Sequence, residues 1–172
     1  MPSATNIIMI GMPGVGKSTL GVILAKRLGL DYLDSDVYLQ TRAGRKLQEI
    51  IDADGVDGFR RIEENTILSI DLASHVIATG GSVVYSAKAM AHLKKDGIAC
   101  FLHLGPDQLA ERLQNLATRG IAMAPGQSIE SLYLERQPLY EKFADITVEC
   151  TLKRPEAILG EIIHLLQGFG HH

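Results

Sequence analysis

The chain of 172 residues has few cysteines, no long apolar run and no long basic stretch. Cys100 and Cys150 are too few for a disulfide framework, so we expect buried thiols in a reducing cytosol. No segment reaches the roughly 18 consecutive apolar residues of a membrane span, and no basic region precedes an apolar N-terminal stretch. The formal net charge is −3, which argues against a nucleic-acid surface. We therefore expect a cytoplasmic protein with no nucleic-acid or membrane partner.

Repeats, low-complexity tracts and linkers are also missing, which predicts a single domain over residues 1–172. Apolar runs alternate with segments of helical periodicity. The expected strands are Asn6–Ile10, Asp31–Leu33, His75–Thr79, Ile98–Leu104 and Ile146–Glu149. The expected helices are 17–28, about 55–73, 87–95, 106–116, 128–143 and a last one that begins at Pro155.

This alternation of strands and helices predicts an α/β fold, in which helices cover both faces of a parallel sheet. Ligands of such sheets bind at the carboxyl ends of the strands. One segment, Asn115–Ser128, has no clear period and contains Gly120, Pro125 and Gly126. It predicts a long loop between two helices, which is either a surface connection or a mobile lid.

The segment Gly11–Ser18, GMPGVGKS, matches the phosphate-binding pattern G-x-x-x-x-G-K-[ST] and lies between an expected strand and an expected helix. Its glycines let several backbone N–H groups point at one anion, and the helix dipole adds to the attraction. Lys17 is expected to reach the β- and γ-phosphates, and the Ser18 hydroxyl to bind Mg²⁺. An N-K-x-D segment is missing, which disfavours a GTPase. The expected nucleotide-binding residues of the loop are Gly11, Gly14, Val15, Gly16, Lys17, Ser18 and Thr19.

Two carboxylates, Asp34 and Asp36, flank Ser35 at the end of the second expected strand. Alternate strand residues point to the same side, so both groups could face one cavity. There they could orient a hydroxyl nucleophile, accept its proton or hold Mg²⁺ through water. The alternative is a solvated turn or an N-cap of the following helix.

Three further segments each allow a structural and a functional interpretation. In "GFRRIEEN", Arg60 could form an ion pair with Glu64 four residues later or bind a substrate carboxylate. In "IATGGSVV", Gly80 and Gly81 could make a simple turn or let the backbone approach a ligand. In "LERQPLYEKFAD", Arg136 could be a surface charge or a second anion-binding group.

Taken in order, the segments GMPGVGKST, LDSD, FRRIEE, ATGG and ER-x-PLY resemble the shikimate kinase family, over about Asn6–Leu166. The resemblance implies a P-loop fold with a five-stranded parallel sheet in three α/β/α layers and a lid. It also implies transfer of the ATP γ-phosphate to a hydroxyl of shikimate, with Mg²⁺ as cofactor and a monomeric enzyme.

The resemblance also implies individual roles. Lys17 and Ser18 would serve phosphates and metal, while Asp34 would hold Mg²⁺ through water or accept a proton. Asp36 would hold substrate hydroxyls and take part in catalysis. The substrate carboxylate would be bound by Arg60 and Arg136, with backbone N–H groups supplied by Gly80 and Gly81. Adenine would lie between Arg112 and Pro155, and Arg119 would be the lid arginine that reaches the transferred phosphoryl group.

The chain departs from the family pattern in two places. The family usually has three consecutive glycines where this chain has Gly80 and Gly81 followed by Ser82. Arg119 is followed by "GIAMAP" where the family usually has R-P-L-L or a similar sequence. Two alternatives therefore stay open at this point: a related kinase for another hydroxy acid, such as a sugar acid, and a non-catalytic nucleotide-binding homologue.

Overall fold

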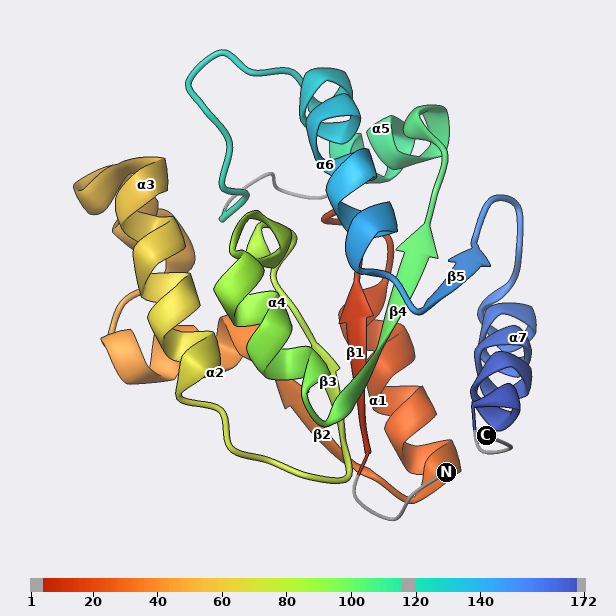
Figure 1. The fold of residues 1–172 in the computed structure, drawn as a ribbon. Helices are drawn as coiled ribbons and strands as arrows, with labels where there is room; N and C mark the ends of the chain where they lie inside the picture. The colour runs from red at the N-terminus through yellow and green to blue at the C-terminus, as the bar shows by residue number, and fades with distance from the viewer. Residues whose placement is uncertain (1–4, 116–119, 170–172) are drawn as a thin grey trace.

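The computed structural model describes residues 5–115 and 120–169 (Figure 1). Its centre is a five-stranded sheet with the order β2-β3-β1-β4-β5, in which all neighbouring strands are parallel. The strands are β1 (Asn6–Ile10), β2 (Asp31–Asp34), β3 (His75–Ala78), β4 (Gly97–His103) and β5 (Ile146–Glu149). The sequence-based prediction of a five-stranded parallel α/β fold is confirmed.

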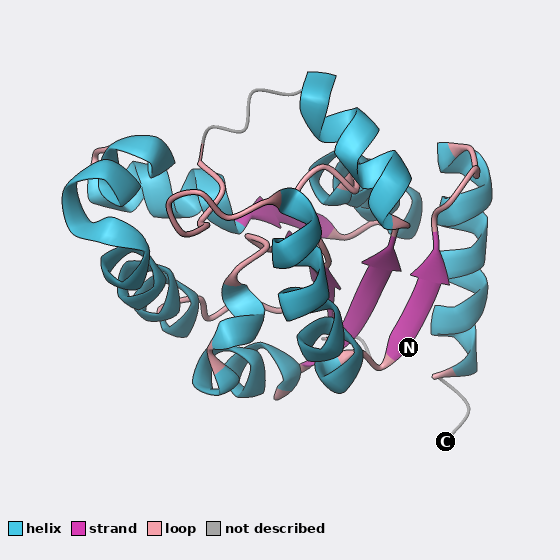
Figure 2. Ribbon diagram, turned by 90° about the horizontal axis from the view of Figure 1, so that it is seen from above, coloured by secondary structure: helices cyan, strands magenta, loops and turns pink. Residues whose placement is uncertain are grey.

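Helices cover both faces of this sheet, as the view from above shows (Figure 2). They are α1 (Lys17–Leu28), α2 (Ser35–Ala43), α3 (Leu47–Leu68), α4 (Ala87–Lys94), α5 (Pro106–Asn115), α6 (Ile129–Phe143) and α7 (Pro155–Gly168), with a short 3₁₀ turn, η1 (Val83–Tyr85). Helices α1 and α7 contact each other on one face, while α4 and α6 contact β4 from the other. None of the described helices is both long and apolar enough to cross a bilayer.

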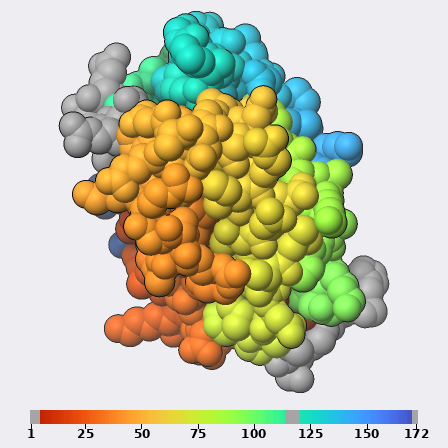
Figure 3. All heavy atoms as spheres, turned by 90° about the vertical axis from the view of Figure 1, so that its left-hand side faces the viewer, coloured from red at the N-terminus to blue at the C-terminus, as the bar shows by residue number. Residues whose placement is uncertain are grey.

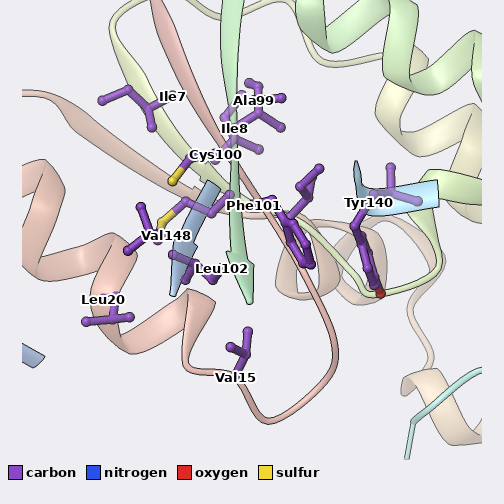
Figure 4. Packing of buried hydrophobic residues seen from close by; sticks show 14 of the residues in the cluster. Ile7, Ile8, Val15, Leu20, Ala99, Cys100, Phe101, Leu102, Tyr140 and Val148 are labelled. Carbon is purple, nitrogen blue, oxygen red and sulfur yellow. The ribbon is translucent and has the colours of Figure 1, made fainter. Parts of the chain in front are cut away.

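The core forms around β1 and β4, because parallel strands covered on both faces consist of continuous apolar runs. Every residue of β1 is buried, as are the five central residues of β4. Figure 4 shows Phe101 of β4 facing Tyr140 of α6, and the two rings stack with centroids 5.2 Å apart. Cys100 and Cys150 are buried free thiols, as the sequence predicted.

Two elements differ from the sequence-based prediction. Helix α2 was not among the expected helices, because Asp34 and Asp36 were interpreted as a strand end, with an N-cap of the following helix only as the alternative. Helix α3 begins at Leu47 rather than near Gly55 and ends at Leu68 rather than Ala73. Gly55 lies inside it with φ 69°, a backbone conformation that interrupts regular helical geometry. The helical periodicity was recognised only from this kink onward, so the prediction missed the first turns of α3.

Candidate active site

A cavity of about 530 Å³ opens at the carboxyl ends of the strands. Its lining residues come from the loop after β1, from the start of α1, from α2, α3, α5 and α6, from the turn after β3 and from residues 120–122. Five of the predicted nucleotide-binding residues line it: Gly14, Gly16, Lys17, Ser18 and Thr19. The other two, Gly11 and Val15, are buried within the loop and lie outside the cavity lining.

The phosphate-binding loop owes its path to glycines with positive φ. Gly14 and Gly16 have φ of 82° and 107°, which only glycine adopts without strain. Gly11 has φ of 145°, and a Cβ atom there would lie 2.6 Å from the carbonyl oxygen of Leu102. The loop therefore packs directly on the end of β4, and a larger residue at Gly11 would push it outward.

The ammonium group of Lys17 lies inside this loop. It donates hydrogen bonds to the carbonyl oxygens of Gly11 at 2.7 Å and Met12 at 2.9 Å. Burial lowers the pKa of Lys17 to about 8, an effect that nearby Asp36 and Asp34 partly offset and Arg136 reinforces. The group is still mostly a cation at neutral pH, positioned at the floor of the cavity.

Asp34 connects the phosphate-binding loop to β2 and α2. Its Oδ1 atom accepts hydrogen bonds from the backbone N–H groups of Asp36 and Val37, which makes it the N-cap of α2. Its Oδ2 atom accepts a hydrogen bond of 2.7 Å from the hydroxyl of Ser18. Asp34 therefore both caps α2 and contacts Ser18, the residue that was expected to bind Mg²⁺.

Asp36 lies in the first turn of α2, so strand alternation is not what orients it. The reasoning from a shared strand face was wrong for this pair, since Asp34 caps the helix while Asp36 lines the cavity. Burial, and then the neighbouring Asp34, raise the pKa of Asp36 to about 6, and Lys17 opposes the rise. Such a carboxylate can accept a proton near neutral pH.

A second buried acid, Glu63 of α3, lines the same cavity. Its Oε2 atom accepts a hydrogen bond of 2.6 Å from the Ser82 hydroxyl, whereas Oε1 is buried and has no partner in the described residues. Burial raises the pKa of Glu63 to about 7. The Ser82 hydrogen bond opposes this rise, the charge of Asp36 adds to it, and Arg136 and Arg60 oppose it.

Gly80 and Gly81 also line the cavity, and they lie next to Glu63 and Arg136. A Cβ atom on Gly80 would lie 2.5 Å from Oε1 of Glu63, and one on Gly81 would lie 2.9 Å from a terminal nitrogen of Arg136. Both positions therefore need glycine because of their neighbours. The Gly80 N–H donates to the Ser35 hydroxyl at 3.0 Å, so a ligand would have to compete with Ser35 for that amide.

Arg136 is almost completely buried, at 1% exposure, and lines the cavity. It donates a hydrogen bond of 2.5 Å to the carbonyl oxygen of Ala122, and its Nε atom lies 3.4 Å from the hydroxyl of Tyr85. A surface charge is therefore excluded for this arginine. Its guanidinium is a buried cation in the cavity lining, with a terminal nitrogen beside Gly81.

Arg60 lies beside the cavity and is not one of its lining residues. Its guanidinium is over the ring of Tyr85, and its nearest acid is Glu135 at 4.0 Å. Glu64, the alternative partner, accepts a hydrogen bond of 2.5 Å from Ser86 instead. The structure thus brings Arg60 and Arg136 together around Tyr85, and only Arg136 faces the cavity.

The predicted lid, 115–128, is described from Gly120 onward. Ala122 is buried against Leu39, Ile50 and Phe59, so this part of the segment packs on α2 and α3. Figure 3 shows its atoms against those of α3. Gly120, Ile121 and Ala122 line the cavity, so this part of the segment forms one of its walls. The predicted lid arginine, Arg119, lies outside the described residues.

The predicted adenine-binding pair lies on the other side of the phosphate-binding loop. Arg112 donates a hydrogen bond of 3.1 Å to the carbonyl oxygen of Val15, and with Leu152 and Lys153 it lines a shallow depression of about 280 Å³. Pro155 is exposed at the first turn of α7, next to this depression but outside its lining.

Among the described residues, no cluster of three or more His, Cys, Asp or Glu side chains could hold a metal ion alone. Mg²⁺ in kinases does not need such a cluster, because it is held by one or two protein oxygens, by water and by the nucleotide phosphates. Ser18 and Asp34, with their oxygens 2.7 Å apart beside the phosphate-binding loop, fit that requirement.

The site geometry can be compared with known proteins. The family model described as Shikimate kinase matches residues 13–167. The chain belongs to the shikimate kinase family.

Two curated relatives are both called shikimate kinase. The one from Thiobacillus denitrificans is 37% identical and covers 87% of this chain and 83% of its own length. The one from Actinobacillus succinogenes is 35% identical and covers 98% and 99%. A solved shikimate kinase from Acinetobacter baumannii, in complex with shikimate, has a TM-score of 0.86 at 28% identity, covering 98% of this chain and 96% of its own.

Sequence reasoning about this shikimate kinase family member missed two site residues, Glu63 and Ser82. Glu63 carried a usable signal, because Phe59 and Ile67 are apolar and lie one turn before and one turn after it on α3. A residue four positions from each shares their buried face. Ser82 carried no such signal, because its contact with Glu63 joins segments 19 residues apart in the chain.

Proposed function

We propose that this member of the shikimate kinase family transfers the γ-phosphoryl group of ATP to a hydroxyl group of shikimate. The observation that carries the proposal is the arrangement of one cavity. The phosphate-binding loop with Lys17 lines it together with two acids, Asp36 and Glu63, and the buried cation Arg136. A polyhydroxy carboxylic acid fits this lining, since its hydroxyls can donate to the acids while its carboxylate meets the guanidinium.

The phosphate-binding loop and its neighbours supply positioning and charge. The N–H groups of the loop and the start of α1 would hold the β- and γ-phosphates, and Lys17 would exchange its carbonyl partners for phosphate oxygens. Ser18 and Asp34 would hold Mg²⁺, the first directly and the second through water, and the ion would offset phosphate charge when bound. Arg112 would support the loop from its outer side through Val15. These residues serve ATP binding rather than acceptor choice.

Asp36 is the better candidate for the proton acceptor of the two aspartates. Both oxygens of Asp34 already accept hydrogen bonds, from the start of α2 and from Ser18. Asp36 faces the cavity, and its raised pKa suits a group that gains a proton in the reaction. The acceptor oxygen would form its bond to phosphorus as the β–γ bridge bond breaks, while its proton passes to Asp36 and ADP leaves.

The segment 120–122 would exclude water from this reaction. It forms one wall of the cavity through Ala122, which is held by Arg136 and by apolar contacts with α3. Exclusion of water suppresses hydrolysis of ATP and strengthens the electrostatic interactions inside the site. Arg119, just before this segment, would bring a further positive charge to the phosphoryl group. The adenine would lie between Arg112 and Pro155.

Release of ADP tests the proposal. Purified protein with Mg·ATP is assayed without acceptor, with shikimate, and with a panel of sugar acids such as gluconate. Phosphorus NMR of the product then identifies the phosphorylated group. We expect shikimate to accelerate ADP release and to give a phosphate monoester. Acceleration by a sugar acid alone would assign a different acceptor, and ATP binding without stimulated turnover would assign a non-catalytic role.

The proposal includes a monomeric, cytoplasmic enzyme with one kinase domain. Its support is that the described residues of one chain bring the phosphate-binding loop and the groups proposed to bind the acceptor to a single cavity, so the proposed reaction needs no second copy. Size-exclusion chromatography with light scattering, compared with specific activity over a range of protein concentrations, tests this part. A rise of specific activity with protein concentration would show that a second copy is needed.

A further inference from the structure

Gly80, Gly81 and Ser82, in the turn after β3, differ in the side chain that each position can accept. Gly80 and Gly81 cannot carry a Cβ atom without approaching Glu63 or Arg136 within 3 Å. Ser82 has φ of −91° and ψ of −6°, a conformation open to any residue. A third glycine is therefore not needed for the turn, and the side chain at this position is free to take part in the site.

The Ser82 hydroxyl has one side-chain partner, the carboxylate of Glu63. Its hydroxyl donates to Oε2 of Glu63 at 2.6 Å, and both residues are only 4% exposed. Oε1 of the same carboxylate is buried, has no partner in the described residues, and lies beside Gly80 at the cavity wall. A buried acceptor without a partner is costly unless a ligand supplies a donor.

We propose that Ser82 is a positioning residue for the phosphoryl acceptor, which fixes the Glu63 carboxylate so that its second oxygen accepts a hydrogen bond from an acceptor hydroxyl. The inference rests on the proposed function. Without the serine hydroxyl, the Glu63 side chain loses the contact that holds its rotamer. The Glu63 carboxylate also loses one hydrogen-bond donor. Its charge interactions with Asp36, Arg136 and Arg60 remain. Recognition of the acceptor becomes weaker, and ATP binding does not change.

A double-mutant cycle separates this role from general stabilisation, because it isolates the coupling between two residues. The variants are Ser82→Ala, Glu63→Met, which removes the acceptor oxygens, and the double variant, each measured by kcat, by KM for Mg·ATP and by kcat/KM for the acceptor. We expect Ser82→Ala to lower kcat/KM for the acceptor about tenfold, mainly through KM, as for loss of a hydrogen bond to a charged group. In the Glu63→Met background the same substitution should change kcat/KM by less than about twofold, because no acceptor is left for the Ser82 hydroxyl.

Ser86→Ala is the matched control. Ser86 also donates to a glutamate of α3, Glu64 at 2.5 Å, but lies outside the cavity. Its hydroxyl in addition caps α4, so its loss should destabilise the fold. We expect Ser86→Ala to lower the unfolding temperature and to leave the acceptor KM unchanged.

The outcomes distinguish failure of the inference from failure of the proposed function. Equal effects of Ser82→Ala in both Glu63 backgrounds, or an effect no larger than that of Ser86→Ala, would overturn the positioning role while shikimate turnover persists. If the wild type turns over another hydroxy acid instead, the proposed acceptor is wrong and the cycle is measured with that compound. A wild type that uses no acceptor of the panel overturns both.

Discussion

The guanidinium of Arg60 lies over the ring of Tyr85, with its Cζ atom 3.6 Å from the ring centroid. Arg136 approaches the same ring with its Cζ at 5.3 Å, and the Tyr85 hydroxyl donates to Glu135. One aromatic ring thus positions both arginines that are expected to bind the acceptor carboxylate. Glu135, 4.0 Å from Arg60, adds an opposite charge on the outer side.

Replacement of Tyr85 should therefore weaken acceptor binding without any direct contact between Tyr85 and the acceptor. We expect Tyr85→Leu to raise KM for the acceptor by about 2- to 30-fold, the range that corresponds to a cation–π contact. Tyr85→Phe keeps the ring and should lose less. Steady-state kinetics of both variants measure this, and equal losses in the two would assign the effect to the hydroxyl rather than the ring.

Lys17 should be required for phosphoryl transfer and dispensable for the fold. Its ammonium is at the floor of the cavity, where charge develops on the transferred group. We expect Lys17→Met to lower kcat by about 10²-fold or more, as for other positioned charges in transition states. Lys26→Met, an exposed position on the same helix, is the control and should keep normal kcat. Normal turnover by Lys17→Met would remove this lysine from the mechanism.

Most of the elements that depend on local sequence patterns could be predicted from the sequence. The five strands follow from apolar runs, and the phosphate-binding loop from glycines at fixed spacing before a lysine. Helix α2 was missed although the alternative of an N-cap pointed to it, because the nine residues of the helix have no clear apolar period. The place of Arg60 could not be predicted either, because Tyr85 and Glu135 reach it from segments distant in the chain. Contacts of this kind are set by the tertiary fold and leave no periodic signal.

Glu63 should make the stability of the protein depend on pH. Burial raises its pKa from 4.5 to about 7, so the folded state keeps a proton that the unfolded chain releases at lower pH. Stability from this group is complete below about pH 4.5 and is lost as pH rises through 7. The full extent of the loss is roughly 3 kcal/mol.

Glu63→Gln removes this titration and should gain stability relative to the wild type as pH rises. We expect the difference in unfolding free energy between the two proteins to widen by about 2 to 3 kcal/mol from pH 5 to pH 8. Urea unfolding at several pH values measures it. Glu64→Gln, which changes a half-buried glutamate of the same helix, is the control. A difference that is constant with pH would show that Glu63 is not the titrating group.

Substitutions of Arg112 and Arg119 should affect different steps, ATP binding for Arg112 and phosphoryl transfer for Arg119. Arg112 contacts the phosphate-binding loop through the carbonyl oxygen of Val15 and lines the depression near Pro155, so we expect its substitution to affect nucleotide binding. We expect Arg112→Ala to raise KM for ATP by about tenfold, with kcat changed less, because a hydrogen bond from a charged group contributes about 1.5–3 kcal/mol.

Arg119→Ala should show the opposite pattern if this arginine reaches the phosphoryl group in the transition state. An interaction made chiefly in the transition state lowers kcat and kcat/KM together when it is removed. We expect a loss in kcat of about 10²-fold with a smaller change in KM for ATP. Steady-state kinetics of the two variants side by side decide the assignment. A kcat within about threefold of wild type, less than 1 kcal/mol in the barrier, would exclude Arg119 from transfer. A large kcat loss in Arg112→Ala instead would move the catalytic role to α5, because Arg112 already lies against the loop that holds the phosphates.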